Sequence, residues 1–272
     1  MATPAPQLED SVIKAVGATA QALASCKRIG VSTGAGVSAE SGVPTFRDAQ
    51  TGLWAKYDPV MLASIDGFRQ DPAMVWKWYD ERRQTIRLVE PNPGHHALAQ
   101  WEQDWRARGR EFQLITQNID DLHCRAGSRD VIELHGNIWF VRPLDAPLSE
   151  AVRLDACPLP EHPPRDSAGR ILRPHVVWFG EQLDPLNVEA AFETAGTCEA
   201  FLVVGTSAVV YPAAALPHYA KRAGALVVEV NPNATEITSL VDYSLRGPSG
   251  VVLPALWASV QEALASVSGQ AS

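Results

Sequence analysis

The sequence predicts a protein of the α/β class, with a doubly wound parallel sheet and a smaller second lobe formed by insertions. Five short, nearly continuous apolar runs recur along the chain, and each of them ends in glycine or polar residues. Strands that helices cover on both faces need such runs. The aromatic-rich helical segment 48–95 and the proline- and charge-rich segment 138–173 break this alternation. We expect these two segments to form the second lobe.

The elements of the large domain are expected in a simple order. Residues 8–26 have the spacing of apolar positions that a helix requires. Because the carboxyl ends of parallel strands lie along one edge of a sheet, the polar residues after the strands are expected to face one cleft. The strands are expected at 28–33, 111–116, 130–134, 200–205 and 225–230. The large domain is then expected to consist of residues 1–47, 96–137 and 174–272.

Size and composition narrow the class of protein. The chain has 272 residues, of which 46% are hydrophobic and 20% are charged, as in globular proteins with a substantial core. The net charge of −8 argues against a nucleic-acid groove, and no apolar run is long enough to span a membrane. The N-terminus lacks a secretory pattern, and the four cysteines are scattered as reduced thiols would be. We expect a cytoplasmic monomer without nucleic-acid or membrane partners.

A glycine-rich stretch, GAGVSAESGVPTFRD at 34–48, follows the first expected strand. Its first six residues fit the pattern Gly-x-Gly-x-x-Gly/Ala, in which the second glycine, here Gly36, lets the main chain approach a pyrophosphate. The N-terminus of a following helix can then hold the phosphates. A turn built of small residues is the alternative. Hydride transfer is not supported, because the region where a dehydrogenase needs an acidic strand end reads GLWAKYDP.

Six motifs occur in one order along the chain and together closely resemble the sirtuins, the NAD-dependent protein deacylases. The resemblance covers about residues 20–255 and implies a Rossmann-like large domain and a small lobe. It also implies that NAD and an acyl-lysine peptide meet in the cleft between them. The motifs are GAGVSAESGVPTFRD, TQNIDDLH (116–123), ELHGN (133–137), RPHVVWFGE (173–181), GTS (205–207) and VNPN (230–233).

The resemblance implies three catalytic residues. His135 matches the histidine that deprotonates a ribose hydroxyl, and an imidazole suits that step because it titrates near neutral pH. Asn118 and Gln117 resemble ribose contacts, and Asp120 resembles the acid that receives the nicotinamide carboxamide. A structural histidine at a strand end is the alternative for His135. The products would be nicotinamide, free lysine and O-acyl-ADP-ribose.

The NAD-binding residues are also implied by the resemblance. Phe46 would shield the reactive sugar carbon, and Arg47 would reach phosphate or ribose. Ordinary turns after strands are the alternative for the residues near the adenosine end. The complete expected set is Gly34, Ala35, Gly36, Ser38, Thr45, Phe46, Arg47, Gln117, Asn118, Ile119, Asp120, Gly205, Thr206, Ser207, Asn231 and Ser249.

The segment HVVWFGE at 175–181 resembles the strand-like segment that pairs with the substrate peptide. Such pairing uses the main chain and tolerates many peptide sequences. Val177 and Phe179 would line the acyl-lysine tunnel. Apolar residues of a core strand are the alternative for Val176 and Trp178.

The helix expected over 71–90 indicates which acyl group is removed. Asp71 can cap this helix, and Tyr79 and Arg82 are three residues apart and therefore share a face. Together with Ala63 they resemble the sirtuin subgroup, class III, that removes succinyl, malonyl or glutaryl groups. Alanine widens the tunnel, and arginine offers a bidentate fork to a distal carboxylate. A surface arginine in a charged helix is the alternative.

Three functions stay open at this point. The leading one is an NAD-dependent lysine deacylase that acts on succinyl or malonyl groups and also on acetyl groups. The second is mono-ADP-ribosyl transfer or the removal of long-chain or lipoyl groups. The third is a non-catalytic NAD sensor, against which the presence of His135, Asn118 and Asp120 argues.

The small lobe departs from the family pattern. Most sirtuins hold a structural zinc there through two Cys-x-x-Cys pairs, and the matching positions here are Pro143, Ala146, Cys157 and Pro160. A structural zinc site needs four ligands, so no zinc is expected. We expect packing to hold the lobe instead, with contributions from Trp139, Phe140 and Leu154.

Overall fold

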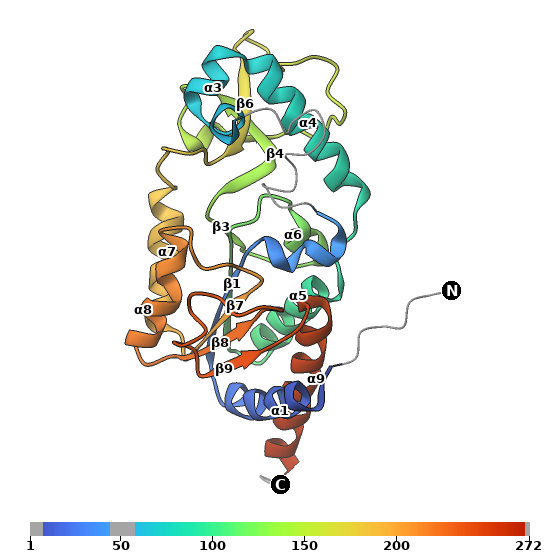
Figure 1. The fold of residues 1–272 in the computed structure, drawn as a ribbon, viewed down its shortest axis with the longest axis vertical. Coiled ribbons are helices and arrows are strands. Elements are labelled where there is room, and N and C mark those ends of the chain that lie inside the picture. The colour runs from blue at the N-terminus through green and yellow to red at the C-terminus, as the bar shows by residue number, and fades with distance from the viewer. Residues whose placement is uncertain (1–7, 44–57, 270–272) are drawn as a thin grey trace, which may run out of the picture.

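The computed structural model describes residues 8–43 and 58–269, and its larger unit is a six-stranded sheet between two layers of helices (Figure 1). The strand order is β3-β2-β1-β7-β8-β9, and all neighbouring strands are parallel. The strands are β1 (Arg28–Thr33), β2 (Glu111–Thr116), β3 (Ile132–Glu133), β7 (Ala200–Val204), β8 (Leu226–Val230) and β9 (Tyr243–Leu245). The predicted fold class is confirmed, and each of the five expected strands is present.

The order of the strands places the site. The chain builds β1, β2 and β3 in one direction and then returns to place β7 on the other side of β1. Ligands of open parallel sheets bind at such a switch point, beyond the carboxyl ends of the strands. A ligand site is therefore expected at the loops that leave β1 and β7.

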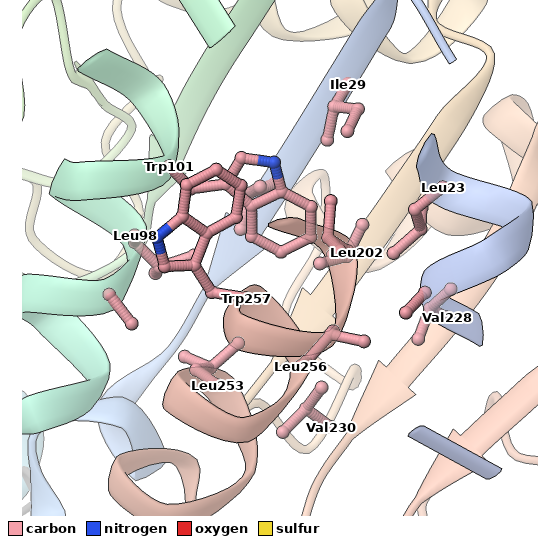
Figure 2. Close-up of a cluster of buried hydrophobic side chains, with 14 of the residues drawn as sticks. Leu23, Ile29, Leu98, Trp101, Leu202, Val228, Val230, Leu253, Leu256 and Trp257 are labelled. Carbon is pink, nitrogen blue, oxygen red and sulfur yellow. The ribbon is translucent and has the colours of Figure 1, made fainter. Parts of the chain in front are cut away.

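Helices cover the two faces of this sheet and give each face its own core. On one face lie α1 (Asp10–Ala24), α5 (Pro93–Ala107) and α9 (Ser249–Gly269), and on the other lie α7 (Pro185–Thr197) and α8 (Leu216–Arg222). Figure 2 shows the first core, where Trp101 of α5 stacks on Trp257 of α9 at 5.3 Å between ring centroids. Burial of such side chains stabilises the fold by about 1.5–3 kcal/mol each.

The second lobe stands at the upper end of Figure 1 and has its own sheet and core. Its antiparallel sheet has the order β5-β4-β6. Trp139 is buried in the core of this lobe, and the partly buried Phe140 and Leu154 pack against that core. The elements are α2 (Pro59–Leu62), α3 (Ile65–Gln70), α4 (Pro72–Leu88), β4 (Gly136–Pro143), β5 (Val152–Arg153) and β6 (Leu172–Val176), while α6 (Leu122–Ala126) follows β2.

Two features of the second lobe matter for the site. Helix α4 begins as predicted, because the Asp71 carboxylate accepts a hydrogen bond of 2.9 Å from the main-chain N–H of Met74. Strand β4 begins three residues after β3 ends, so the chain passes from one sheet to the other at Leu134 and His135. Among the described helices, none combines the length and the apolar character that crossing a membrane requires.

Candidate active site

A cavity of about 520 Å³ lies at the carboxyl ends of β1 and β2 and is lined by residues of both lobes. The large sheet contributes residues that follow its strands, and the small lobe contributes residues of α4 and of the turn before α3. Of the predicted site residues, the cavity brings together Ala35, Ser38, Ala63, Tyr79, Arg82, Gln117, Asn118, Ile119, Asp120, His135, Val177 and Phe179. The predicted Thr45, Phe46 and Arg47 lie outside the described residues.

The glycine loop after β1 packs against the turn after β7. The N–H of Gly36 donates to the carbonyl oxygen of Gly205 at 2.7 Å, and a Cβ on Gly36 would lie 2.6 Å from that oxygen. Position 36 therefore requires glycine, because any side chain there would collide with the main chain of Gly205. The α-helix expected after the glycines is replaced by two short 3₁₀ turns, Ala35–Val37 and Ala39–Ser41, which end at Gly42 with a φ of +84°.

Replacing Gly36 by alanine is expected to destabilise the protein by about 1–3 kcal/mol, because the new methyl group overlaps the Gly205 main chain. This would lower the unfolding temperature by roughly 2–12 °C in a thermal melt. Gly17→Ala in α1 is the matched control, since nothing lies within 4 Å of its added Cβ and alanine is the better helix former. Equal shifts in the two variants would contradict the packing argument.

Asp120 lies buried at the end of a short polar chain. The Ser38 hydroxyl donates to Asp120 Oδ2 at 2.7 Å, the N–H of Leu122 donates to Oδ1 at 3.0 Å, and Asn118 Nδ2 donates to Ser38 Oγ at 3.0 Å. Burial raises the pKa of Asp120, while these hydrogen bonds and the charge of Arg82 oppose that shift. The carboxylate is thus held in one orientation beside the cavity, where it can accept from an amide.

His95 completes this chain, although its sequence context does not single it out. The main-chain N–H of Asn92 donates to His95 Nδ1 at 3.3 Å, so the hydrogen of the neutral ring is on Nε2, 3.3 Å from Ser38 Oγ. Burial lowers the pKa of His95 to about 4, which keeps the ring neutral. Its neighbour His123, with ring centroids 4.8 Å apart, contacts Thr33 Oγ1 at 2.9 Å.

His135 lies where the chain crosses between the lobes, with its ring fixed by the main chain. Nδ1 is 2.9 Å from the carbonyl oxygen of Gln117. A carbonyl only accepts hydrogen bonds, so Nδ1 carries the hydrogen and Nε2 keeps a lone pair. Burial lowers the pKa of His135 below its ordinary value of 6.5. The ring is therefore neutral near pH 7 and can accept a proton.

The pH profile of catalysis should reflect this lowered pKa. If His135 is the predicted base, only its neutral ring works, so activity is present above its pKa and is lost as the pH falls through it. We expect the acid limb of kcat/KM to have its midpoint below 6.5. The measurement is kcat/KM over roughly pH 4–8, with thermal melts at each pH to exclude unfolding. A midpoint above 6.5 would contradict the assignment.

The predicted adenosine-end residues meet around the turn after β7. Gln117 Nε2 donates to Thr206 Oγ1 at 3.3 Å, and Asn231 Nδ2 donates to the Thr206 carbonyl at 3.0 Å. Gly205 adopts a φ of +59°, and Ser207 beside it is exposed. Ser249 begins α9 within the described chain, outside the cavity, and its buried hydroxyl contacts Glu40 at 3.3 Å.

The cavity is also lined by Tyr79 and Arg82 of α4. Trp178 Nε1 donates to the Tyr79 hydroxyl oxygen at 2.9 Å, which leaves the Tyr79 hydrogen available to another acceptor. Burial raises the pKa of Tyr79 to about 12, so the phenol stays protonated. Within the described part of the chain, Nε and Nη1 of Arg82 are buried without a hydrogen-bond partner. The guanidinium lies 5.0 Å from the centre of the Trp78 ring, but its unsatisfied donors are costly to bury and favour an anionic ligand.

Ala63 and residues 177–180 form part of the wall of the cavity. The main-chain N–H of Phe179 donates to the Ala63 carbonyl at 2.8 Å, and that of Val177 donates to the His135 carbonyl at 2.9 Å. The ring of Phe179 is 57% exposed at the mouth of the cavity. Main-chain hydrogen bonds thus connect the 177–180 segment to both Ala63 and His135.

Comparison with known proteins identifies the family. A model described as the Sir2 family matches residues 34–212. The chain belongs to the Sir2 family. It is 48% identical over 253 residues to a protein of Ralstonia nicotianae named NAD-dependent protein deacylase, covering 91% of this chain and 99% of that protein.

Two solved structures are similar to this Sir2-family chain. One, described as a Sir2 homolog–NAD complex, has a TM-score of 0.82 and 41% identity, and it covers 97% of this chain and 98% of its own. The other is the structure of Sir2Af2 bound to a myristoylated histone peptide, with a TM-score of 0.72 and 34% identity, covering 93% and 99%. Both likenesses extend over the two lobes.

Proposed function

We propose that this Sir2-family protein is an NAD-dependent protein-lysine deacylase with a preference for acidic acyl groups, succinyl and malonyl, over acetyl. Its likeness to a relative named NAD-dependent protein deacylase supports the general activity. The preference rests on one observation, the buried guanidinium of Arg82 beside the Tyr79 hydroxyl in the same cavity as His135.

The residues present fit NAD, which supplies an electrophilic ribose carbon and nicotinamide as the leaving group when it is bound. Asp120 would accept from the carboxamide, and the Ser38 hydrogen bond holds its carboxylate ready. Gln117 and Asn118 would contact the ribose. The exits of β1 and β7 would face the phosphates and the adenosine, with the expected residues Gly34, Ala35, Gly36, Ser38, Gly205, Thr206 and Ser207. Thr45, Phe46, Arg47, Asn231 and Ser249 complete the proposed set.

His135 would act as the general base. Its Nδ1 is bound to the Gln117 carbonyl, so Nε2 is the atom that would accept the proton. The proposal requires a ribose hydroxyl to lie in the cavity beside Nε2. Removing that proton makes the oxygen a better nucleophile toward the acyl carbon. Assistance of this kind is worth about 10²–10⁴-fold in rate.

The acyl group would enter between Ala63 and Val177. A succinyl or malonyl carboxylate would then receive hydrogen bonds from Arg82 and from the Tyr79 hydroxyl, whose oxygen is already held by Trp178. Such a pairing satisfies the guanidinium atoms that lack a partner among the described residues. Truncating one side of a desolvated charge pair costs about 2–5 kcal/mol, enough to reverse a preference between acyl groups.

The two lobes would divide this work. In the proposed arrangement the large domain, residues 1–47, 96–137 and 174–272, binds NAD, and the small lobe, residues 48–95 and 138–173, recognises the acyl group. The location of Tyr79 and Arg82 on α4 supports this division. His135 lies at the crossing between them.

A panel of peptides tests the preference. The same peptide carrying acetyl, succinyl, malonyl, glutaryl, lipoyl or myristoyl lysine would be incubated with NAD, and kcat/KM would be measured for each. The proposal expects the highest values for succinyl and malonyl lysine and a lower value for acetyl lysine. The proposal would be abandoned if acetyl or a long-chain group came first.

Long-chain deacylation is the second candidate. The similarity to a structure bound to a myristoylated peptide favours it, and the small Ala63 would admit a wide chain. Against it, a long alkyl chain would bury the Arg82 guanidinium with no hydrogen-bond acceptor, which is costly. The myristoyl peptide in the panel decides between the two.

A further inference from the structure

The part of the small lobe that carries a structural zinc in most sirtuins does not fit a metal in this chain. Of the four matching side chains only Cys157 is a ligand type, and a structural zinc site needs four ligands. The nearby His162 has its Nε2 committed to Asp80 at 3.2 Å. Among the described residues, side chains that could share a metal gather only at Asp121, Cys124 and Glu133, outside this segment.

Side chains of α4 hold the same segment instead. The fully buried Arg83 donates from Nη2 to the carbonyl of Leu154, and its guanidinium lies 4.9 Å from the centre of the Trp139 ring. One turn further along, Arg87 Nη1 donates to the carbonyl of Cys157 at 2.6 Å. Two arginines of α4 therefore donate hydrogen bonds to two main-chain carbonyls of the segment between β5 and β6.

Asp80 completes the attachment from the same helix face. Its Oδ2 accepts from the main-chain N–H of Leu159 at 3.0 Å and lies 3.2 Å from His162 Nε2, and its Oδ1 is 3.7 Å from Arg83 Nη1. Asp80 is 1% exposed and Arg83 is fully buried, so the two form a buried pair of opposite charges, although the facing atoms are not hydrogen-bonded to each other. Removing one partner of such a pair strongly destabilises a fold, because it leaves the other charge uncompensated.

These residues are also tied to the acyl end of the cavity. Asp80, Arg83 and Arg87 follow one another at helical spacing and share a face of α4, and Tyr79 and Arg82 are their immediate neighbours on the adjoining face. The segment from Leu154 to His162 is therefore attached to the helix that presents the acyl-recognising side chains. A rotation of α4 would move both faces together.

We propose that Asp80, Arg83 and Arg87 form a metal-independent clamp, the α4 clamp, which replaces the zinc in holding the small lobe and positions Tyr79 and Arg82 for the acyl group. The positioning part rests on the proposed function, whereas the metal-independent part does not. The three residues are positioning residues, since none of them lines the cavity as the described residues define it.

Metal dependence is tested on the wild-type protein. The clamp predicts that the purified protein contains substoichiometric zinc and that a strong chelator leaves both its unfolding temperature and its turnover unchanged. Stoichiometric zinc, together with a fall in unfolding temperature on chelation, would overturn the inference.

Variants test the clamp itself. Arg83→Met and Asp80→Asn are each expected to lower the unfolding temperature by about 6–12 °C, and Arg83→Lys is expected to restore part of the loss. Arg69→Met on α3 is the control, because Arg69 and its partner Asp145 are both exposed. Unfolding temperatures of Arg83→Met and Asp80→Asn that match the control would contradict the clamp.

A kinetic readout separates positioning from stability. At a temperature where Asp80→Asn and Arg83→Lys stay folded, the KM for the succinyl peptide should rise about 10- to 100-fold while the KM for NAD stays unchanged. Equal increases in both values would overturn the positioning role. If the wild type did not remove succinyl groups, the proposed function would fail, but the metal analysis and the unfolding temperatures would still decide whether the clamp exists.

Discussion

Replacing Arg82 by methionine should lower kcat/KM for a succinyl-lysine peptide by roughly 30- to 5,000-fold while deacetylation is retained. The expected range corresponds to the about 2–5 kcal/mol that is lost when one side of a desolvated charge pair is removed. Methionine keeps much of the volume of arginine, so the tunnel stays filled. An acetyl group has no distal carboxylate and therefore does not use the guanidinium.

The comparison needs a control on the same helix. Lys77→Met removes a cation from an exposed position of α4 and should leave both activities as in the wild type. The measurement is kcat/KM for succinyl and acetyl forms of one peptide with each variant. Loss of both activities to the same degree in Arg82→Met would show that the residue supports the fold or NAD binding instead of the acyl preference.

Replacing His135 by alanine should lower turnover by about 10²–10⁴-fold with every acyl peptide, because the ribose hydroxyl loses its base. The effect should appear in kcat, since the proton is removed only after the substrates are bound. Thermal melts must show a folded variant, because the ring also binds the Gln117 carbonyl. His218→Ala, at an exposed position of α8, is the control. A His135→Ala enzyme of normal activity would refute the base assignment.

Local chemistry made much of the fold predictable from sequence. The apolar runs locate five strands of the large sheet because strands covered on both faces consist mainly of apolar side chains. Asp71 and Pro72 identify the start of α4 because capping depends on neighbouring residues alone. Strand β9 escaped prediction, since Asp242, Ser244 and Arg246 interrupt its apolar residues and leave no apolar run.

Features that depend on contacts between distant residues could not be predicted in the same way. Gly36 is required by Gly205, which lies far along the chain, and no local pattern reports that contact. His95 reaches Ser38 across 57 residues, and Arg83 reaches Leu154 across 71. Motif resemblance alone predicts the proposed catalytic and acyl-binding residues, whereas the hydrogen bonds that orient them emerge only in the folded chain.

The identity of the products tests the central claim most directly. The protein would be incubated with NAD and a succinyl-lysine peptide, and the products would be followed by mass spectrometry. The proposed chemistry predicts nicotinamide, unmodified lysine peptide and O-succinyl-ADP-ribose in equal amounts. An ADP-ribosylated peptide, or no release of nicotinamide with any acyl peptide, would contradict it.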